Sequence, residues 1–345
     1  MLSLAAACDR YSPDAACEDD KAWSLATTSP SIGLAAGADG LLVSLEALEA
    51  IELDDRTFGA NSHGLAMLDP ADGAIRWTAE LPADGLWHGA DISPGGVVVA
   101  GEVRVGGETD RLIVHRLDPV DGSEMWSIET TGERSGEGLL PIAASDDRVA
   151  VSTSTAVVML DAADGSVLWQ QDVAADDIAI SVDGQVAASQ VFGSQVNLLD
   201  AADGSVIWTH DAGTGVNAIA ATDDGAVTIA VGFMPYTIRR LGADGSVLWE
   251  NVLSGRWFDS LAALPGGDVL WMAGLEDRVD TIDGTTVEDG CGYITQLAAA
   301  EGSASHIRPM CDCAVDAVAT ADPSGRAYLG LPDTSGDGGS ISAFQ

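Results

Sequence analysis

Four oxygen-bearing side chains stand at similar places in successive segments of this 345-residue chain, about seven to nine residues before the glycine of a following turn. They are Asp177, Asn217, Asp259 and Asp316, and His88 and Asp91 lie in a related stretch. Carboxylate and amide oxygens are the ligands that hard cations prefer, so such side chains would hold a hydrated Ca²⁺ or Na⁺ where they converge. The alternative is that they only hydrate a polar part of the molecule.

The five cysteines permit a second kind of chemistry. Cys8 follows a short apolar stretch ending in three alanines, which resembles the end of a bacterial lipoprotein signal whose cysteine becomes lipidated. The other four, an even number suited to two disulfides in an exported protein, are Cys17, Cys291, Cys311 and Cys313. Zinc is the alternative for the last three together with His306, although the C-x₂₋₄-C spacing of structural zinc sites is missing.

No catalytic motif accompanies these residues. The sequence contains no dinucleotide-binding loop, Walker loop, zinc-protease motif or nucleophile elbow. None of its five histidines forms a recognisable nucleophile–base motif with a Cys or Ser. The motifs therefore favour a binding protein over an enzyme.

The charge of the chain limits the classes of partner that its folded surface can bind. Fifteen Lys and Arg against 54 Asp and Glu give a formal net charge of −39. Such a field repels phosphates and anionic lipid headgroups, which excludes nucleic acid and direct membrane binding as functions of the folded surface. Membrane attachment is expected only through a lipid on Cys8. An acidic surface of this kind is best tolerated in salt, because salt screens the self-repulsion.

The elements that would position these residues repeat along the chain. The letters LDAADGSVLW at 160–169 return as LDAADGSVIW at 199–208. Further copies start at Leu68, Leu117, Leu241 and Leu297. In the last copy His306 stands where the others have tryptophan. The glycines of the six copies are 39 to 57 residues apart, a period typical of repeat architectures.

Each repeat is predicted to form about four short strands. A run rich in Val and Thr precedes the motif, Asp-Gly makes a tight turn, and the tryptophan opens a further strand. A four-stranded sheet must stack on a neighbour to bury both faces, which favours a β-propeller. Tryptophans that recur at one place are expected to fill the space between blades. They are Trp23, Trp77, Trp126, Trp169, Trp208 and Trp249.

The motif at 160–169 resembles the signature of the PQQ-like β-propeller family, and the resemblance covers most of residues 23–345. Quinoprotein dehydrogenases and outer-membrane assembly lipoproteins share this repeat, so it implies a propeller but no particular activity. The vicinal cysteine pair of the quinoproteins has no counterpart here, because one residue separates Cys311 from Cys313. No organic cofactor is therefore predicted, and Ca²⁺ is kept as a candidate ion for the oxygen-bearing side chains described above.

Six motif copies and one composite blade predict an all-β, seven-bladed propeller of four-stranded antiparallel blades. The stretch at 325–344 would supply strands of the seventh blade, and KAWSLATT at 21–28 its last strand. Pairing these two segments closes the ring and covers sheet edges. Eight blades are the alternative, with the extra blade between Gly245 and Gly302, where the spacing is longest.

Residues 1–20 are predicted to form an N-terminal tether with the remnant of a lipoprotein signal, and residues 21–345 a single propeller domain. Ring closure would bring Cys17 towards Cys311 and Cys313. Two cysteines separated by one residue in a strand face opposite ways, so we expect Cys17 to bond one of them and Cys291 the other.

The expected function is that of a non-catalytic binding or scaffold propeller of a bacterial cell envelope. Its partners would be envelope or surface proteins, or an unidentified ligand. The protein would be exported, as a periplasmic, outer-membrane or surface lipoprotein. The alternative is a PQQ- and calcium-dependent quinoprotein dehydrogenase.

Overall fold

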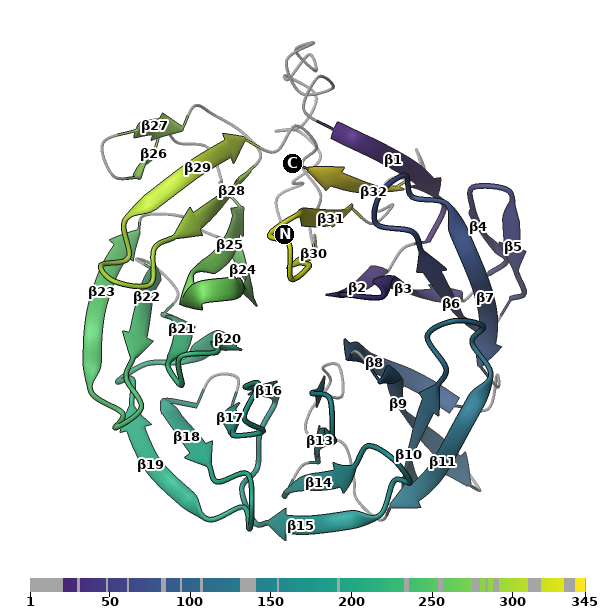
Figure 1. Cartoon of the computed structure of the whole chain (residues 1–345), viewed down its shortest axis with the longest axis horizontal. Helices are drawn as coiled ribbons and strands as arrows, with labels where there is room; N and C mark the ends of the chain where they lie inside the picture. The colour runs from purple at the N-terminus through teal and green to yellow at the C-terminus, as the bar shows by residue number, and fades with distance from the viewer. Residues whose placement is uncertain are drawn as a thin grey trace.

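The computed structural model of the chain is a ring of β-sheets (Figure 1). The structure describes residues 21–29, 32–47, 49–60, 62–81, 85–93, 95–105, 108–130, 141–153, 155–190, 193–232, 236–253, 257–274, 280–282, 285–287, 292–309, 318–331 and 339–344. In these ranges the one helical element is η2 (Pro265–Gly267), a short 3₁₀ turn, and every other element is a strand. None of the helical structure described is long and apolar enough to cross a membrane.

Seven antiparallel sheets of four strands form the blades. The strands of each blade are given below in their spatial order, from the central axis outwards. Blade 1 comprises β2 (Ile32–Gly37), β3 (Gly40–Ala47), β6 (Ser62–Leu68) and β7 (Ile75–Leu81). Blade 2 comprises β8 (Gly85–Ser93), β9 (Gly96–Val105), β10 (Glu108–Leu117) and β11 (Glu124–Thr130). Blade 3 comprises β12 (Ile142–Ala144), β13 (Arg148–Ser152), β14 (Val157–Asp161) and β15 (Val167–Gln171). Blade 4 comprises β16 (Asp177–Ile180), β17 (Val186–Ser189), β18 (Gln195–Leu199) and β19 (Val206–Asp211).

The remaining blades complete the ring. Blade 5 comprises β20 (Val216–Ala221), β21 (Val227–Val231), β22 (Tyr236–Leu241) and β23 (Val247–Leu253). Blade 6 comprises β24 (Trp257–Ala263), β25 (Val269–Gly274), β28 (Gly292–Leu297) and β29 (Ala304–Pro309). Blade 7 comprises β30 (Val318–Ala321), β31 (Ala327–Leu331), β32 (Gly339–Phe344) and β1 (Lys21–Thr27). The innermost strands contact one another in chain order from β2 to β30, and β30 contacts β2, which confirms the seven-bladed propeller.

The N-terminal strand closes the ring, as predicted. β1 pairs antiparallel with β32, with Trp23 opposite Ala343 and Thr27 opposite Gly339. Ser342 Oγ also donates a hydrogen bond to Ser24 Oγ, at 2.9 Å. Blade 7 therefore joins segments from the two ends of the sequence, and the edge of β32 is covered by a strand instead of being left open for aggregation.

Two hairpins are inserted between blade strands. β4 (Ile51–Leu53) and β5 (Arg56–Phe58) follow β3, and β4 pairs with β1, so this hairpin extends the sheet of blade 7. β26 (Asp280–Ile282) and β27 (Thr285–Val287) follow β25. The second hairpin lies in the long interval between the fifth and sixth motifs, so that interval holds an insertion in blade 6. The eight-bladed alternative is wrong.

Each repeat tryptophan bridges to the following blade. Trp169 Nε1 donates a hydrogen bond to the Ala201 carbonyl of blade 4, at 3.0 Å, and the indole covers Gly204. A Cβ atom on Gly204 would lie 2.5 Å from the indole, and its φ of +72° is one that other residues rarely adopt. The same two contacts join Trp23 to Pro70 and Gly73, Trp77 to Pro119 and Gly122, Trp126 to Ala162 and Gly165, Trp208 to Ala243 and Gly245, and Trp249 to Ala299 and Gly302.

The junction between blades 6 and 7 is built differently. His306 of β29 stands where the other outer strands carry tryptophan. In blade 7 the third and fourth strands are β32 and β1, which no Asp-Gly turn connects because they are far apart in the sequence. A tryptophan at 306 would have no turn glycine to cover, which accounts for the absence of tryptophan from the sixth motif.

Stacking buries the middle strands on both faces. All five residues of β21 and all four of β17 are buried, and both strands are mostly Val and Ala with Ile, Thr or Ser. A continuous apolar run of this kind is typical of strands covered on both sides. The blades thus form one rigid support for the residues at the central axis and at the outer strands.

Candidate functional site

Three of the four residues predicted to bind a cation, Asp177, Asn217 and Asp259, belong to innermost strands. Asp177 begins β16, and Asn217 lies in β20 of the next blade. Asp259 belongs to β24, but its side chain and the whole of Asp316 lie outside the described residues, as does the side chain of His88. The structure therefore places two of the four predicted ligands, on neighbouring strands.

Asp177 ties blade 4 to blade 5. Its carboxylate accepts hydrogen bonds from the backbone N–H groups of Ile219, in blade 5, and of Ile178. Burial raises the pKa of Asp177 to about 7, although both hydrogen bonds act to lower it. A carboxyl group with this pKa is divided between its protonated and ionised forms near neutral pH, and a cation beside it would favour the ionised form.

Asp91 makes the same kind of tie between blades 2 and 3. Its Oδ2 accepts a hydrogen bond from Ala144 N at 2.7 Å, and its Oδ1 accepts one from Ile92 N at 2.8 Å. Burial raises the pKa of Asp91 to about 6. An aspartate on one innermost strand thus binds the backbone of the next innermost strand at two places in the ring.

Asn217 uses its amide within its own blade. Val216 pairs with Val231 and Ala218 with Ala230, so Asn217 is the extra residue of a β-bulge. Its Nδ2 donates to the Gly232 carbonyl at 2.6 Å. In the described part of the chain no three His, Cys, Asp or Glu residues come together as a metal would require. The cation site stays a prediction.

The cysteines cannot be placed in the same way. All five lie outside the described residues: Cys8, Cys17, Cys291, Cys311 and Cys313. The lipidation, the two disulfides and the zinc alternative therefore stay predictions.

The outer strands carry a feature that the sequence analysis does not identify. In blade 4, Leu198 pairs with Trp208 and Leu199 with Val206, so Ile207 is the extra residue of a β-bulge. The bulge leaves Val206 and Ile207 each 42% exposed while it turns Trp208, 9% exposed, against the next blade. Two consecutive apolar residues therefore face solvent.

Blades 3 and 5 repeat this bulge before their tryptophans. We call the resulting surface the apolar rim; it consists of Val167, Leu168, Val206, Ile207, Val247 and Leu248. The tryptophan contacts link successive pairs, because Trp169 follows Leu168 and covers Gly204, two residues before Val206. β15, β19 and β23, which carry the rim, follow one another around the outside of the ring (Figure 1). The signal in the sequence was the apolar pair before each tryptophan, in SVLW and SVIW.

Comparisons with known proteins agree with this architecture. Residues 110–256 match the family model described as outer membrane protein assembly factor BamB. These repeats are PQQ-like β-propeller repeats. No curated protein sequence matches the chain.

Solved structures resemble the chain over almost its whole length. The crystal structure of BamB from Moraxella catarrhalis is 17% identical, with 91% of this chain and 96% of that chain covered and a TM-score of 0.49. A chain of the mitotic checkpoint complex is 14% identical, with 94% and 91% covered and a TM-score of 0.60. The computationally designed Ika8 protein is 12% identical, with 94% and 99% covered and a TM-score of 0.55. At such identities the last two show the fold alone.

The family match coincides with one part of the propeller. Residues 110–256 contain blades 3, 4 and 5 together with the outer half of blade 2. All six residues of the apolar rim lie inside this segment. The exposed apolar surface thus belongs to the repeats in which the motif is best preserved.

Proposed function

We propose that this protein is a non-catalytic, protein-binding scaffold of a bacterial cell envelope and that the apolar rim is its contact surface. The observation that carries the proposal is the rim itself. Exposed apolar residues gathered on one side of a soluble surface are typical of interaction sites, because covering them removes apolar area from water. The six residues recur on three successive blades, so they offer a partner an extended surface instead of a single contact.

The family match supports the same role. The matching family model describes an outer-membrane protein assembly factor, and its match includes the whole rim. An exported protein, periplasmic or associated with the outer membrane, agrees with that description. A lipid on Cys8 would hold it at the membrane surface.

The partner's surface should be apolar at its centre and basic at its border. Asp164, Asp203 and Asp244 lie in the turns that precede the three rim pairs. Hydrogen bonds from Ser166 lower the pKa of Asp164, and those from Ser246 lower that of Asp244, so these carboxylates stay ionised. Lysine or arginine beside an apolar patch would complement them and speed association.

Photo-cross-linking in envelope fractions tests the proposal. A photoreactive amino acid at Ile207 or at Leu248 should give one discrete cross-linked protein, the same from both positions. Val182 is the matched control, because it is an exposed apolar residue of blade 4, 63% exposed, that lies outside the rim. The paired change Ile207→Asp and Leu248→Asp should abolish co-purification of that protein while the Val182→Asp change leaves it intact.

The outcomes separate clearly. Identical cross-links from Val182 and from the rim, or none from the rim, would overturn the contact surface. Fractionation tests the anchor separately, since Cys8→Ser should move the protein from the membrane fraction to the soluble fraction. Nothing among the described residues favours the PQQ-dependent dehydrogenase considered from the sequence.

A further inference from the structure

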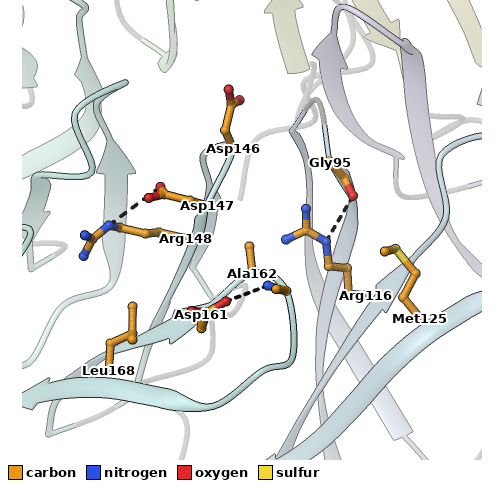
Figure 2. A pocket seen from close by; sticks show the side chains of 10 residues that line it. Gly95, Arg116, Met125, Asp146, Asp147, Arg148, Asp161, Ala162 and Leu168 are labelled. Carbon is orange, nitrogen blue, oxygen red and sulfur yellow. Dashed lines mark hydrogen bonds and ion pairs between the residues drawn. The ribbon is translucent and has the colours of Figure 1, made fainter.

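A pocket of about 370 Å³ lies between blades 2 and 3 (Figure 2). Blade 2 contributes Gly95, Arg116 and Met125 to its lining, and blade 3 contributes Asp147, Asp161 and Leu168 among others. The lining thus combines two guanidinium groups, those of Arg116 and Arg148, with carboxylates and apolar side chains, and Arg148 is already paired with Asp147 at 3.7 Å. Leu168 also belongs to the apolar rim, but the other lining residues belong neither to the rim nor to the predicted cation site.

Arg116 is the unusual member of the lining. It is only 2% exposed, yet its Nη1 has no hydrogen-bond partner among the described residues. Its Nε donates to the Gly95 carbonyl at 3.3 Å. Figure 2 shows the guanidinium directed from β10 into the space between the blades. A guanidinium stays charged in proteins even where burial lowers its pKa, as burial does for Arg116, so a buried charged donor is left unsatisfied.

Blade 5 has an arginine at the same position, and there its donors are satisfied. Arg240 precedes the motif leucine as Arg116 does, and it pairs with Trp249 as Arg116 pairs with Trp126. Arg240 Nη2 lies 2.8 Å and 2.7 Å from the two carboxylate oxygens of Asp224. Its Nη1 donates to the Gly267 carbonyl of blade 6 at 2.5 Å. This arginine is fully engaged, with a carboxylate of its own blade and a backbone group of the next.

The missing partner in blade 2 is a carboxylate. Asp224 lies in the turn between the first two strands of blade 5, and Gly95 lies in the corresponding turn of blade 2. A Cβ atom on Gly95 would lie 2.5 Å from Arg116 Nη2. With glycine at this position the Arg116 guanidinium lies where a side chain would begin, and the turn supplies no carboxylate like that of Asp224.

We propose that this pocket binds a small zwitterionic ligand of the amino-acid class, whose carboxylate pairs with Arg116 in the place that Asp224 occupies beside Arg240. A simple anion fits less well, because Asp146, Asp147 and Asp161 also line the pocket. Asp147 pairs with Arg148 at 3.7 Å. Asp161 lies close enough to Arg116 to act against the lowering of its pKa. Asp146 would therefore face the cationic group of the ligand. Met125 and Leu168 would contact the chain between its two charged ends.

The first experiment measures binding of ω-amino acids of two to six carbons by calorimetry or ligand-observed NMR, at fixed ionic strength, to the full chain. At least one of them should bind to the wild type. The matching carboxylic acid and the matching amine should each bind at least tenfold more weakly, because each lacks one of the two charged contacts. Arg116→Gln should weaken the amino acid at least tenfold.

A matched pair of variants isolates the role of the vacant carboxylate position. Gly95→Asp supplies a carboxylate from the protein itself, as Asp224 does in blade 5, and should abolish binding while raising the midpoint of thermal unfolding. Gly95→Asn adds a side chain of the same shape without the charge and should retain more binding than Gly95→Asp. Because Gly95→Asp should be the more stable of the two, misfolding cannot explain its loss of binding.

Three results would overturn the proposal. The pocket is not a ligand site if none of the amino acids binds, or if Arg116→Gln and Gly95→Asp both bind as the wild type does. The zwitterion is the wrong class if the carboxylic acid alone binds as tightly as the amino acid. Binding of the amine alone with undiminished affinity would remove Arg116 from the site.

Discussion

The junctions that follow blade 2 and blade 5 share one plan and differ at one group. Both have the tryptophan over a turn glycine, Trp126 over Gly165 and Trp249 over Gly302. After blade 5, Asp224 and a carbonyl of blade 6 satisfy the buried arginine. After blade 2, the equivalent arginine keeps a donor with no partner among the described residues, beside a pocket.

This difference shows that the tryptophan and the turn glycine of each repeat stabilise the blade junction, while positions in the turn between the first two strands can vary. The tryptophan and the glycine must be kept together, because either alone leaves a gap or a clash between blades. The turn between the first two strands is not held in that way. An aspartate there completes the polar contacts of the junction, whereas with a glycine the buried arginine keeps a donor that has no partner among the described residues.

The largest effect should come from the contact that both junctions share. Trp249→Ala should lower the free energy of unfolding by roughly 3–5 kcal/mol, and Trp126→Ala by less because Trp126 is only partly buried. Urea denaturation of both variants measures this. Val252→Ala on the same outer strand is the control, since Val252 is 62% exposed and should cost under about 0.5 kcal/mol. Equal losses from Trp249→Ala and Val252→Ala would contradict the bridging role of the indole.

The fold was predictable because its decisive contacts lie in the repeated letters. The Asp-Gly turn and the tryptophan occur in the same ten residues, so the motif shows both partners of the blade junction. The closing strand was predictable for a related reason. The segment around Trp23 resembles the last strand of a repeat, but the strands that should precede it are missing from the sequence before it. The hairpin β26–β27 was not, because an insertion and an additional blade lengthen the spacing alike.

The functional surfaces were less accessible to sequence analysis. Alternation along a strand predicts that one of Val206 and Ile207 faces inwards, and only the bulge at Ile207 exposes both. The difference between Arg116 and Arg240 depends on a residue of an earlier turn, Gly95, which is 21 positions before Arg116, or Asp224, which is 16 positions before Arg240. A side chain that is missing from one copy leaves no motif to recognise.

Removing the satisfied arginine tests the filled junction. Arg240→Met should lower the free energy of unfolding by about 2 kcal/mol, because Asp224 and the Gly267 carbonyl would both lose a charged donor. The control is Arg56→Met. Arg56 lies 3.4 Å from Asp55, their side chains are 56% and 78% exposed, and surface pairs of this kind contribute under about 1 kcal/mol. Chemical denaturation should therefore rank the two variants clearly, and a reversed ranking would contradict the comparison.

The junction after blade 2 should also respond to pH through Asp91. Its pKa of about 6 in the folded protein lies above that of an unfolded-chain aspartate, about 3.9. The folded state thus binds the proton more tightly, so this contribution to stability is present at low pH and is lost as the pH rises from about 4 through 6. Asp91→Asn should remove that component, which makes the wild type lose on the order of 2 kcal/mol relative to the variant between pH 4 and 7. Unfolding curves that run parallel over this range would contradict the raised pKa.

The smallest effect, and the sharpest contrast, should come from Arg116→Met. The methionine keeps most of the apolar stem of the arginine and removes a buried charge whose Nη1 has no partner among the described residues. The free energy of unfolding should therefore change by less than about 1 kcal/mol, in either direction. Arg116→Ala should cost more than Arg116→Met, because it also removes the stem that packs between the blades. Denaturation of these two variants beside Arg240→Met distinguishes a vacant guanidinium from an engaged one. A loss for Arg116→Met as large as that for Arg240→Met would mean that the protein itself already satisfies Arg116, and the pocket would then lack the charge that a ligand carboxylate requires.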